Sequence, residues 1–166
     1  MATQDNLKEA FAGESQANRK YLAFAKTADA EGKPGIARLF RAAAEAETIH
    51  AHAHLRALGG IGDTATNLKA AAEGESHEFT AMYPAFIEEA KQEGAKAALK
   101  SFQFANAVEK IHHGLYEKAS AALVAGGDFE AERIVVCPVC GNTVVGAAPD
   151  ECPICGVPGE KFVTIA

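Results

Sequence analysis

The sequence predicts a mainly α-helical protein, with a four-helix bundle followed by a small metal-binding domain. Residues 1 to about 126 are rich in Ala, Glu, Lys and Leu, and their apolar residues recur at the three- and four-residue spacing of helices. All four cysteines lie in the last 30 residues, as two C-x2-C pairs. We therefore expect two domains, a helical bundle at 1–130 and a cysteine-rich domain at 131–166.

Glycine-containing breakers divide the helical region into four parts. They are "EGKPG" at 31–35, "LGGIGDTAT" at 58–66, "QEGAK" at 92–96 and "AGGD" at 125–128. These breakers predict helices near residues 3–30, 36–58, 65–92 and 95–125. Four helices of similar length joined by short loops indicate a four-helix bundle. After Gly127 the sequence is rich in valine, glycine and proline, which indicates short strands and tight turns.

Composition argues against several classes of partner. The 166 residues carry a formal net charge of −6 and no basic tract, which argues against binding nucleic acid or an anionic membrane. No apolar run approaches the ~20 residues of a membrane span. The segment "MATQDNLKEAF" lacks the apolar region of a secretory signal. We expect a cytoplasmic protein whose cysteines stay reduced and free to bind metal.

An internal repeat relates the two halves of the helical region. "GESQANRKYLAFAKTADAEG" from Gly13 resembles "GESHEFTAMYPAFIEEAKQEG" from Gly74. Glu14 matches Glu75 at an offset of 61. Three further pairs match at an offset of 62, namely Tyr21 with Tyr83, Glu47 with Glu109, and His50 with His112. Two similar helical hairpins packed about a pseudo-twofold axis would bring their four helices to one central point.

The repeat carries the ligands of a two-metal site. Both halves contain Glu-x-x-His, and a spacing of three places the two side chains on one helical face. One Glu from each of two helices plus Glu-x-x-His from the other two is the pattern of di-iron and di-manganese carboxylate bundles. Bridging carboxylates offset the repulsion between two cations, and imidazoles supply terminal nitrogen ligands. The predicted ligands are Glu14, Glu47, His50, Glu75, Glu109 and His112.

Glu78 is a surplus carboxylate. Its counterpart in the first half is Gln16 or Ala17, yet it lies one helical turn beyond Glu75 on the same face. A single Glu-x-x-His is usually a solvated surface feature, and it is the matched pair that favours metal binding here. For the remaining candidates we expect packing or surface roles only: His52, His54, His77, His113, Glu45 and Glu73.

These residues, with the cysteine tail, resemble the rubrerythrin family over essentially the whole chain. The resemblance implies a ferritin-like di-iron bundle followed by a rubredoxin-like domain. It implies terminal carboxylates at Glu14 and Glu75, and bridging carboxylates at Glu47 and Glu109. It also implies terminal imidazoles at His50 and His112, and an extra glutamate at Glu78 that exchanges with the first histidine as the iron changes oxidation state. Tyr21 and Tyr83 match tyrosines that line the family's site, with core packing as the alternative.

The tail reads C-x2-C-x11-C-x2-C, with a glycine after each pair. The ligands are Cys137, Cys140, Cys152 and Cys155. Four thiolates suit tetrahedral iron or zinc, and the spacing alone leaves both open. The resemblance implies iron, although "RIVVC" lacks the aromatic residue that commonly precedes the first cysteine in the family.

The resemblance implies a peroxidase that reduces hydrogen peroxide to water. Electrons would come from NAD(P)H through a separate reductase or rubredoxin and enter at the tail iron. No G-x-G-x-x-G opens a helix, so we do not expect the chain itself to bind the nicotinamide. A ferritin-like ferroxidase and a zinc-stabilised binding module are the alternatives, and the tail and Glu78 favour the peroxidase. We expect a homodimer with electrons crossing between chains, because the tail begins about 20 Å along the helix axis from the metal ligands.

Overall fold

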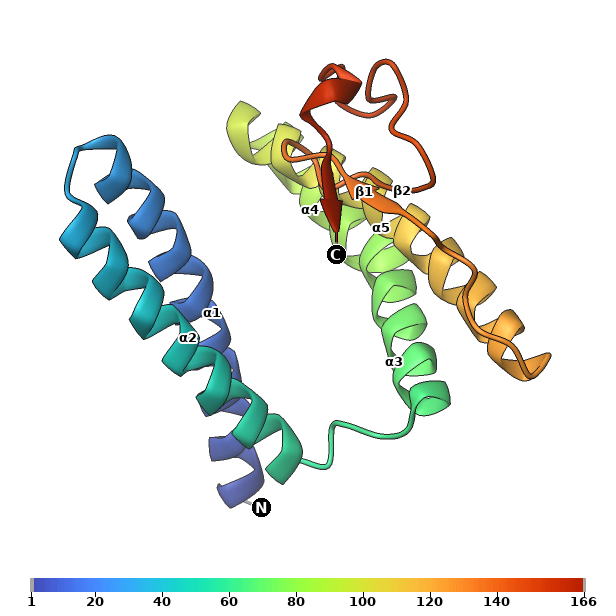
Figure 1. Ribbon diagram of the computed structural model, residues 1–166, viewed down its shortest axis with the longest axis horizontal. Helices are drawn as coiled ribbons and strands as arrows, with labels where there is room; N and C mark the ends of the chain where they lie inside the picture. The colour runs from blue at the N-terminus through green and yellow to red at the C-terminus, as the bar shows by residue number, and fades with distance from the viewer. Residues whose placement is uncertain (1, 166) are drawn as a thin grey trace. The chain divides into compact units, whose positions relative to one another are not determined.

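The computed structural model describes residues 2–165, and the chain divides into two compact units, Met1–Gly62 and Asp63–Ala166 (Figure 1). The first unit holds α1 (Ala2–Ala30) and α2 (Pro34–Ala57). The helices of the second unit are α3 (Thr64–His77), the π-helix η1 (Glu78–Met82), α4 (Tyr83–Gln92) and α5 (Lys96–Val124). Among these described residues no helix is both long enough and apolar enough to cross a membrane.

The structure confirms the predicted helices except the third. The expected 3–30, 36–58 and 95–125 correspond to α1, α2 and α5 within two residues at each end. The expected helix 65–92 is wrong as one regular α-helix, because η1 interrupts it. A π-helix inserts one extra residue into an α-helix. This insertion falls between Glu75 and Tyr83, where the offset of the repeat changes from 61 to 62.

The first unit is a helical hairpin held together by small residues. Ala37, Ala44 and Ala51 are buried at intervals of seven along α2, so α1 can approach this stripe closely. The buried Asn18 of α1 donates hydrogen bonds to the Ala44 carbonyl at 2.7 Å and to Thr48 Oγ1 at 2.8 Å. These bonds fix the register of α1 against α2, and therefore the height of each ligand on one helix relative to the other.

In the second unit α3, η1 and α4 pack along α5 (Figure 1). Asp63 caps α3, since its carboxylate accepts a 2.8 Å hydrogen bond from the Thr66 amide. Beyond η1, Tyr83 lies among aromatic rings, with centroids 6.3 Å from Phe86 and 6.2 Å from Phe102. This aromatic packing fixes α4 against α5 beside the π-helix.

The tail forms a small antiparallel sheet of order β2-β1-β3, with β1 (Ile134–Val136), β2 (Thr143–Val145) and β3 (Val163–Ile165). A short 3-10 helix, η2 (Gly159–Lys161), precedes β3. Val135 lies at the centre of the sheet and is fully buried. Strand β2 contacts α5, which belongs to the same unit. The cysteine domain is therefore packed on the helix that carries Glu109 and His112.

Candidate metal centres

The first hairpin brings three predicted ligands together. Glu14 comes from α1, and Glu47 and His50 come from α2; one potential ligand atom of each lies within 4.8 Å of the others. We call these residues the first cluster. His50 Nδ1 lies 2.9 Å from Glu47 Oε2, as the three-residue spacing predicts. The His50 ring is 55% exposed, whereas the Glu47 side chain is only 18% exposed.

The second unit repeats this arrangement with the second cluster, Glu75, Glu109 and His112. His112 Nδ1 lies 2.9 Å from Glu109 Oε2 and 3.6 Å from Glu75 Oε1. The two clusters thus share the same histidine–glutamate geometry, as the repeat predicts. Each cluster is complete within its own unit as a group of two carboxylates and one imidazole.

The electrostatics of the second cluster fit a bound cation. Burial raises the pKa of Glu75 to about 7, and a hydrogen bond and charge from Glu109 add to this effect. Glu75 Oε2 is buried and has no hydrogen-bond partner among the described residues. A buried carboxylate oxygen of this kind is costly unless a cation or donor satisfies it. Carboxylates with imidazoles also suit divalent iron or manganese, so the donor set and the unpartnered oxygen both fit a metal site.

Glu78 and Tyr83 lie beside the second cluster. Burial raises the pKa of Glu78, and the charge of Glu109 raises it further, while His77 and His112 lower it. Burial also raises the pKa of Tyr83, with added effects from Glu78, Glu109 and Glu75. The charges of the cluster residues therefore affect the pKa of both side chains, although neither side chain belongs to the second cluster.

Tyr21 occupies the equivalent place in the first unit, on the helix that carries Glu14. Its ring centroid lies 6.2 Å from that of Phe40 and 6.3 Å from that of Phe24. The tilted stacking of these rings holds Tyr21 within an aromatic group on α1 and α2. In this hairpin the tyrosine has the packing environment of its repeat partner Tyr83, which also lies between two phenylalanines.

The four cysteines converge on one point in the tail. Cys137 Sγ lies 3.5 Å from Cys155 Sγ, and Cys140 Sγ lies 3.6 Å from Cys152 Sγ. Sulfurs bound at 2.3 Å to one tetrahedral metal are ~3.8 Å apart, whereas a disulfide needs ~2.05 Å. The arrangement therefore fits a four-thiolate metal centre.

Backbone turns hold the two cysteine pairs in matching conformations. The amide of Gly141 donates to the Cys137 carbonyl at 3.0 Å, and the amide of Gly156 donates to the Cys152 carbonyl at 2.9 Å. Both glycines have positive φ, +85° and +76°, which a side chain would strain. Burial tends to raise the pKa of Cys152, but hydrogen bonds from the backbone of Cys155 and Ile154 outweigh it and lower that pKa to about 6. The backbone is therefore arranged to stabilise a thiolate.

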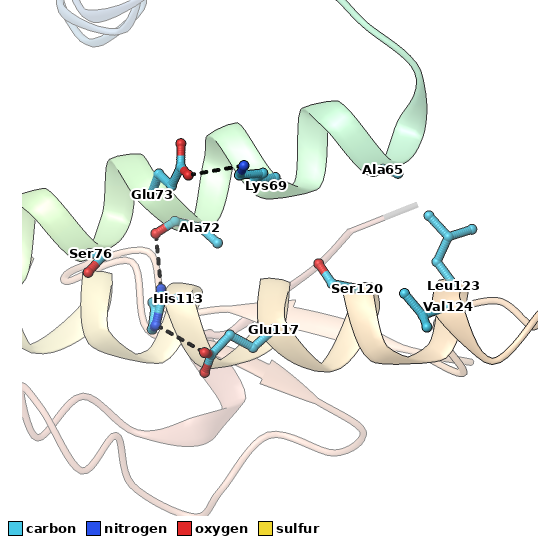
Figure 2. A pocket seen from close by; sticks show the side chains of 10 residues that line it. All are labelled: Ala65, Lys69, Ala72, Glu73, Ser76, His113, Glu117, Ser120, Leu123 and Val124. Atoms are coloured by element: carbon cyan, nitrogen blue, oxygen red, sulfur yellow. Dashed lines mark hydrogen bonds and ion pairs between the residues drawn. The ribbon is translucent and has the colours of Figure 1, made fainter.

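His113, the neighbour of His112, has a different role. Its Nδ1 donates a 3.0 Å hydrogen bond to the Ala72 carbonyl, and its Nε2 lies 3.5 Å from Glu117 Oε1 (Figure 2). It lies in a hollow of about 710 Å³ between α3 and α5, where Lys69 pairs with Glu73 at 3.8 Å. Both ring nitrogens face protein groups and the second cluster lies elsewhere, so His113 ties α5 to α3, which agrees with the expected packing role.

Sequence reasoning missed the contact between the tail and the second cluster. Thr143 Oγ1, at the start of β2, lies 2.9 Å from His112 Nε2. Helix α5 runs to Val124, about three turns beyond His112, but residues 125–133 return the chain along the helix. The tail therefore reaches the second cluster of its own chain, whereas we expected it to begin about 20 Å away along the axis and to reach the bundle of the other chain. No residue pattern in "GGDFEAER" predicts that the chain turns back along α5.

Comparison with known protein families agrees with both metal centres. Residues 5–120 match the rubrerythrin family, and residues 136–163 match the rubredoxin-like domain of rubrerythrin. The two matched segments contain all six bundle ligands, Glu78 and the four cysteines. The family match therefore extends over both predicted metal centres.

Individual relatives resemble the chain over nearly its whole length. Rubrerythrin-2 of Clostridium acetobutylicum is 36% identical, over 96% of this chain and 95% of that protein. Rubrerythrin of Porphyromonas gingivalis is 38% identical, over 96% of this chain and 88% of its own. A solved structure of nigerythrin in a partially reduced state is 36% identical, with a TM-score of 0.58, and covers 98% of this chain and 86% of that one.

Proposed function

The chain belongs to the rubrerythrin family, and we propose that it is a peroxidase that reduces hydrogen peroxide to water as a defence against oxidative stress. One observation carries the proposal: the four-cysteine domain packs directly on His112, a residue of the second cluster. A site that consumes electrons then lies beside a centre that can deliver them. Reduction of one peroxide to two waters needs two electrons and two protons, so such an arrangement suits this reaction.

The six ligands of the two clusters would hold two irons, with Glu47 and Glu109 as bridges. When bound there, two ferrous ions would supply the two electrons that the reduction of peroxide needs. Around them Glu78 would serve as an alternative ligand, and its raised pKa fits a group that lacks a fixed cationic partner. The phenol groups of Tyr83 and Tyr21 would donate hydrogen bonds to peroxide, and burial, which raises the pKa of Tyr83, favours its protonated form.

The four-cysteine centre would hold one iron and receive single electrons from an external NAD(P)H-dependent reductase or a rubredoxin. Because these thiols must remain reduced to bind metal, we assign the protein to the cytoplasm. A ferroxidase of the ferritin type would use the same bundle ligands but needs no electron inlet. A zinc-stabilised binding module would need neither Glu78 nor the paired clusters. The tail and the carboxylates together therefore favour the peroxidase.

We propose that the working unit is a homodimer in which the two chains share each di-iron site. Ferritin-like bundles join their two hairpins by one long crossover. Here only residues 58–63 separate α2 from α3, and the amides of Leu58 and Gly60 still bond to His54 and Leu55 of α2. This connection reaches ~25 Å at most when extended, whereas the 24 residues of α2 span ~36 Å.

A second copy removes the need for a crossover, because its hairpin can supply the missing pair of helices. In such a dimer the first cluster of one chain would meet the second cluster and tail of the other. Electrons would then pass from each tail to the second cluster of its own chain.

Mixing inactive variants tests this arrangement. A Glu47→Ala chain mixed with a Cys155→Ser chain should regain activity, because heterodimers contain one intact site with an intact tail. A Glu109→Ala chain mixed with a Cys155→Ser chain should stay inactive, since both changes lie in the second unit. Recovery in the second mixture would contradict electron transfer within one chain. Failure of the first, with heterodimers shown by mass spectrometry, would contradict the shared site.

The proposed activity is tested by comparing oxidants. The iron-loaded protein is reduced without oxygen and mixed with either hydrogen peroxide or dioxygen, and the oxidation of its iron is followed by absorbance. We expect peroxide to react much faster than dioxygen, and steady consumption of peroxide with NAD(P)H and a reductase. A faster reaction with dioxygen, with iron accumulating in the protein, would instead support the ferroxidase.

A further inference from the structure

Thr143 joins the cysteine domain to the second cluster. It is the first residue of β2 and follows the turn that closes the first cysteine pair. Its hydroxyl lies 2.9 Å from His112 Nε2 and 3.0 Å from the carbonyl oxygen of Gly141, the residue after Cys140. The Thr143 side chain is half-buried, so water has only partial access to these two bonds.

The partners of Thr143 fix the direction of both hydrogen bonds. A carbonyl oxygen only accepts, so the single hydroxyl proton of Thr143 is donated to Gly141. The hydroxyl oxygen must therefore accept from His112, which places the ring proton on Nε2. A ring with its proton on Nε2 leaves Nδ1 as the nitrogen that can bind a metal, and Nδ1 faces Glu109 at 2.9 Å and Glu75 at 3.6 Å. This is the tautomer that a metal ligand needs.

The first cluster has no such support. Within residues 2–165, His50 forms its hydrogen bond through Nδ1 to Glu47, and its Nε2 has no protein partner. The His50 ring is 55% exposed against 28% for His112. The two histidines are equivalent in the repeat, and the Thr143 hydroxyl from the tail is a partner that only His112 has among the described residues.

We propose that Thr143 is a positioning residue for the di-iron site: it holds His112 in the orientation and tautomer that bind metal. The partners that orient a ligating histidine typically change metal affinity by about 10–100-fold when removed. Thr143 is itself held by Gly141, next to Cys140, so this side chain connects the turn of the first cysteine pair to a predicted ligand of the bundle. The inference concerns metal binding at the proposed di-iron site and does not require that the reaction be peroxide reduction.

The test compares three variants of the full-length protein. Thr143→Val removes the hydroxyl while keeping the shape, and Thr143→Ser keeps the hydroxyl. Thr164→Val is the control, because Thr164 lies in the same sheet but its hydroxyl pairs with Arg133 at 3.2 Å. Ferrous iron binding at the bundle is measured without oxygen against a competing chelator. The thiolate absorption of the tail reports that the cysteine domain remains folded.

We expect Thr143→Val to weaken bundle iron binding by about 10–100-fold, and Thr143→Ser to restore most of it. Thr164→Val should bind as the unchanged protein does. If the valine variant loses its thiolate absorption, Thr143→Ala replaces it. Iron binding at the unchanged level in a folded variant without the hydroxyl would overturn the proposal. So would a serine variant that binds as weakly as the valine variant.

Nuclear magnetic resonance of the zinc-loaded protein supplies a readout that does not depend on activity. With ¹⁵N-labelled histidine, the His112 ring should show a proton on Nε2 that exchanges slowly with water. This signal should persist in Thr143→Ser and exchange rapidly in Thr143→Val. A His112 proton on Nδ1, or the same slow exchange in the valine variant, would contradict the assigned tautomer and its cause. Neither result depends on whether peroxide is the substrate.

Discussion

The two metal-ligand clusters are built from the same repeat but differ in their surroundings. In both, a glutamate and a histidine three residues apart place Nδ1 and Oε2 2.9 Å apart. The first cluster lies in a hairpin held by the alanine-rich contact of α1 and α2 and by the hydrogen bonds of Asn18. Around the second cluster the structure adds the π-helix with Glu78, the buried Glu75 and the Thr143 contact. The two halves of the repeat thus carry the same set of ligand residues, and the surrounding contacts make the second half chemically distinct.

A one-residue insertion is the smallest of these additions. An extra residue in an α-helix rotates everything beyond it by about 100° unless a π-turn absorbs it. Here the π-helix, which begins at Glu78, accommodates the extra residue. Glu75 before it and Tyr83 after it therefore both keep their positions in the repeat. The inserted residue therefore accounts for the break in the third helix, and Glu78 is the first residue of the π-helix.

The largest expected effect comes from the two glutamates that we propose as bridges between the bundle metals. Glu47→Ala and Glu109→Ala should each abolish binding of both bundle metals, because each removes a proposed bridge. The iron content should fall from about three per chain to about one, held by the cysteines. Metal analysis of the purified variants checks this. A variant that still holds two bundle metals would show that its glutamate is not a bridge.

The second-largest expected effect comes from the cysteines of the tail. Cys137→Ser or Cys155→Ser should remove the thiolate absorption and stop turnover driven by NAD(P)H, since four thiolates are needed for the tetrahedral centre. The bundle, once chemically reduced, should still react with peroxide a single time. Rapid-mixing absorbance measures that turnover. Its loss in these variants would mean that the tail maintains the bundle itself.

Glu78 tests the difference between the two halves of the repeat, because the first half has no carboxylate at the equivalent position. Glu78→Ala should keep both bundle metals but lower turnover with an artificial electron donor by roughly 10–100-fold, the range seen when a group around a metal is lost. Glu73→Ala is the matched control, since Glu73 is an exposed carboxylate on the preceding helix. Equal turnover in the two variants would remove any special role for Glu78.

The smallest expected effect is the pH dependence of the metal-free protein. Burial raises the pKa of Glu75 from 4.5 to about 7, so between these values the folded state holds a proton that the unfolded state has lost. Stability should therefore fall as pH rises through this window. Because solvent screens the group, we expect a shift of only a few degrees in Tm.

Glu75→Gln should flatten this pH dependence, and Glu14→Gln, in the first cluster, should leave it in place. Thermal unfolding followed by circular dichroism in the presence of a chelator is the measurement. A metal-free protein that becomes more stable as pH rises from 4.5 to 7 would contradict the raised pKa of Glu75. Loss of the pH dependence in Glu14→Gln would show that it arises from the first cluster and not from Glu75.

The grouping of most residues in the two clusters and the cysteine centre could be predicted because it follows from spacing. Glu-x-x-His fixes a histidine beside a glutamate on any helix, and C-x2-C fixes a pair of sulfurs at a turn. Helix ends were marked by breakers such as Gly32 and Gly59, both of which adopt positive φ. The π-helix was also visible in the sequence, as a change of repeat offset, although its meaning depends on the geometry.

The Thr143 contact could not be predicted, because it joins residues 31 positions apart through an irregular connection. A threonine at the start of a strand is ordinary, and nothing in its neighbours marks a partner. The path of residues 125–133 depends on many weak contacts rather than on one pattern. Local rules therefore identify ligands, whereas the contacts around ligands emerge only from tertiary packing.

The central claim is that the paired clusters and the tail form one system for reducing peroxide. The most direct test is a titration of the fully reduced, iron-loaded protein with hydrogen peroxide in the absence of oxygen. Two bundle irons and one tail iron carry about three electrons per chain, so the thiolate absorption should reach its plateau at about 1.5 peroxides per chain. A tail that stays reduced after the bundle irons are oxidised, or a bundle that does not react with peroxide, would contradict the account.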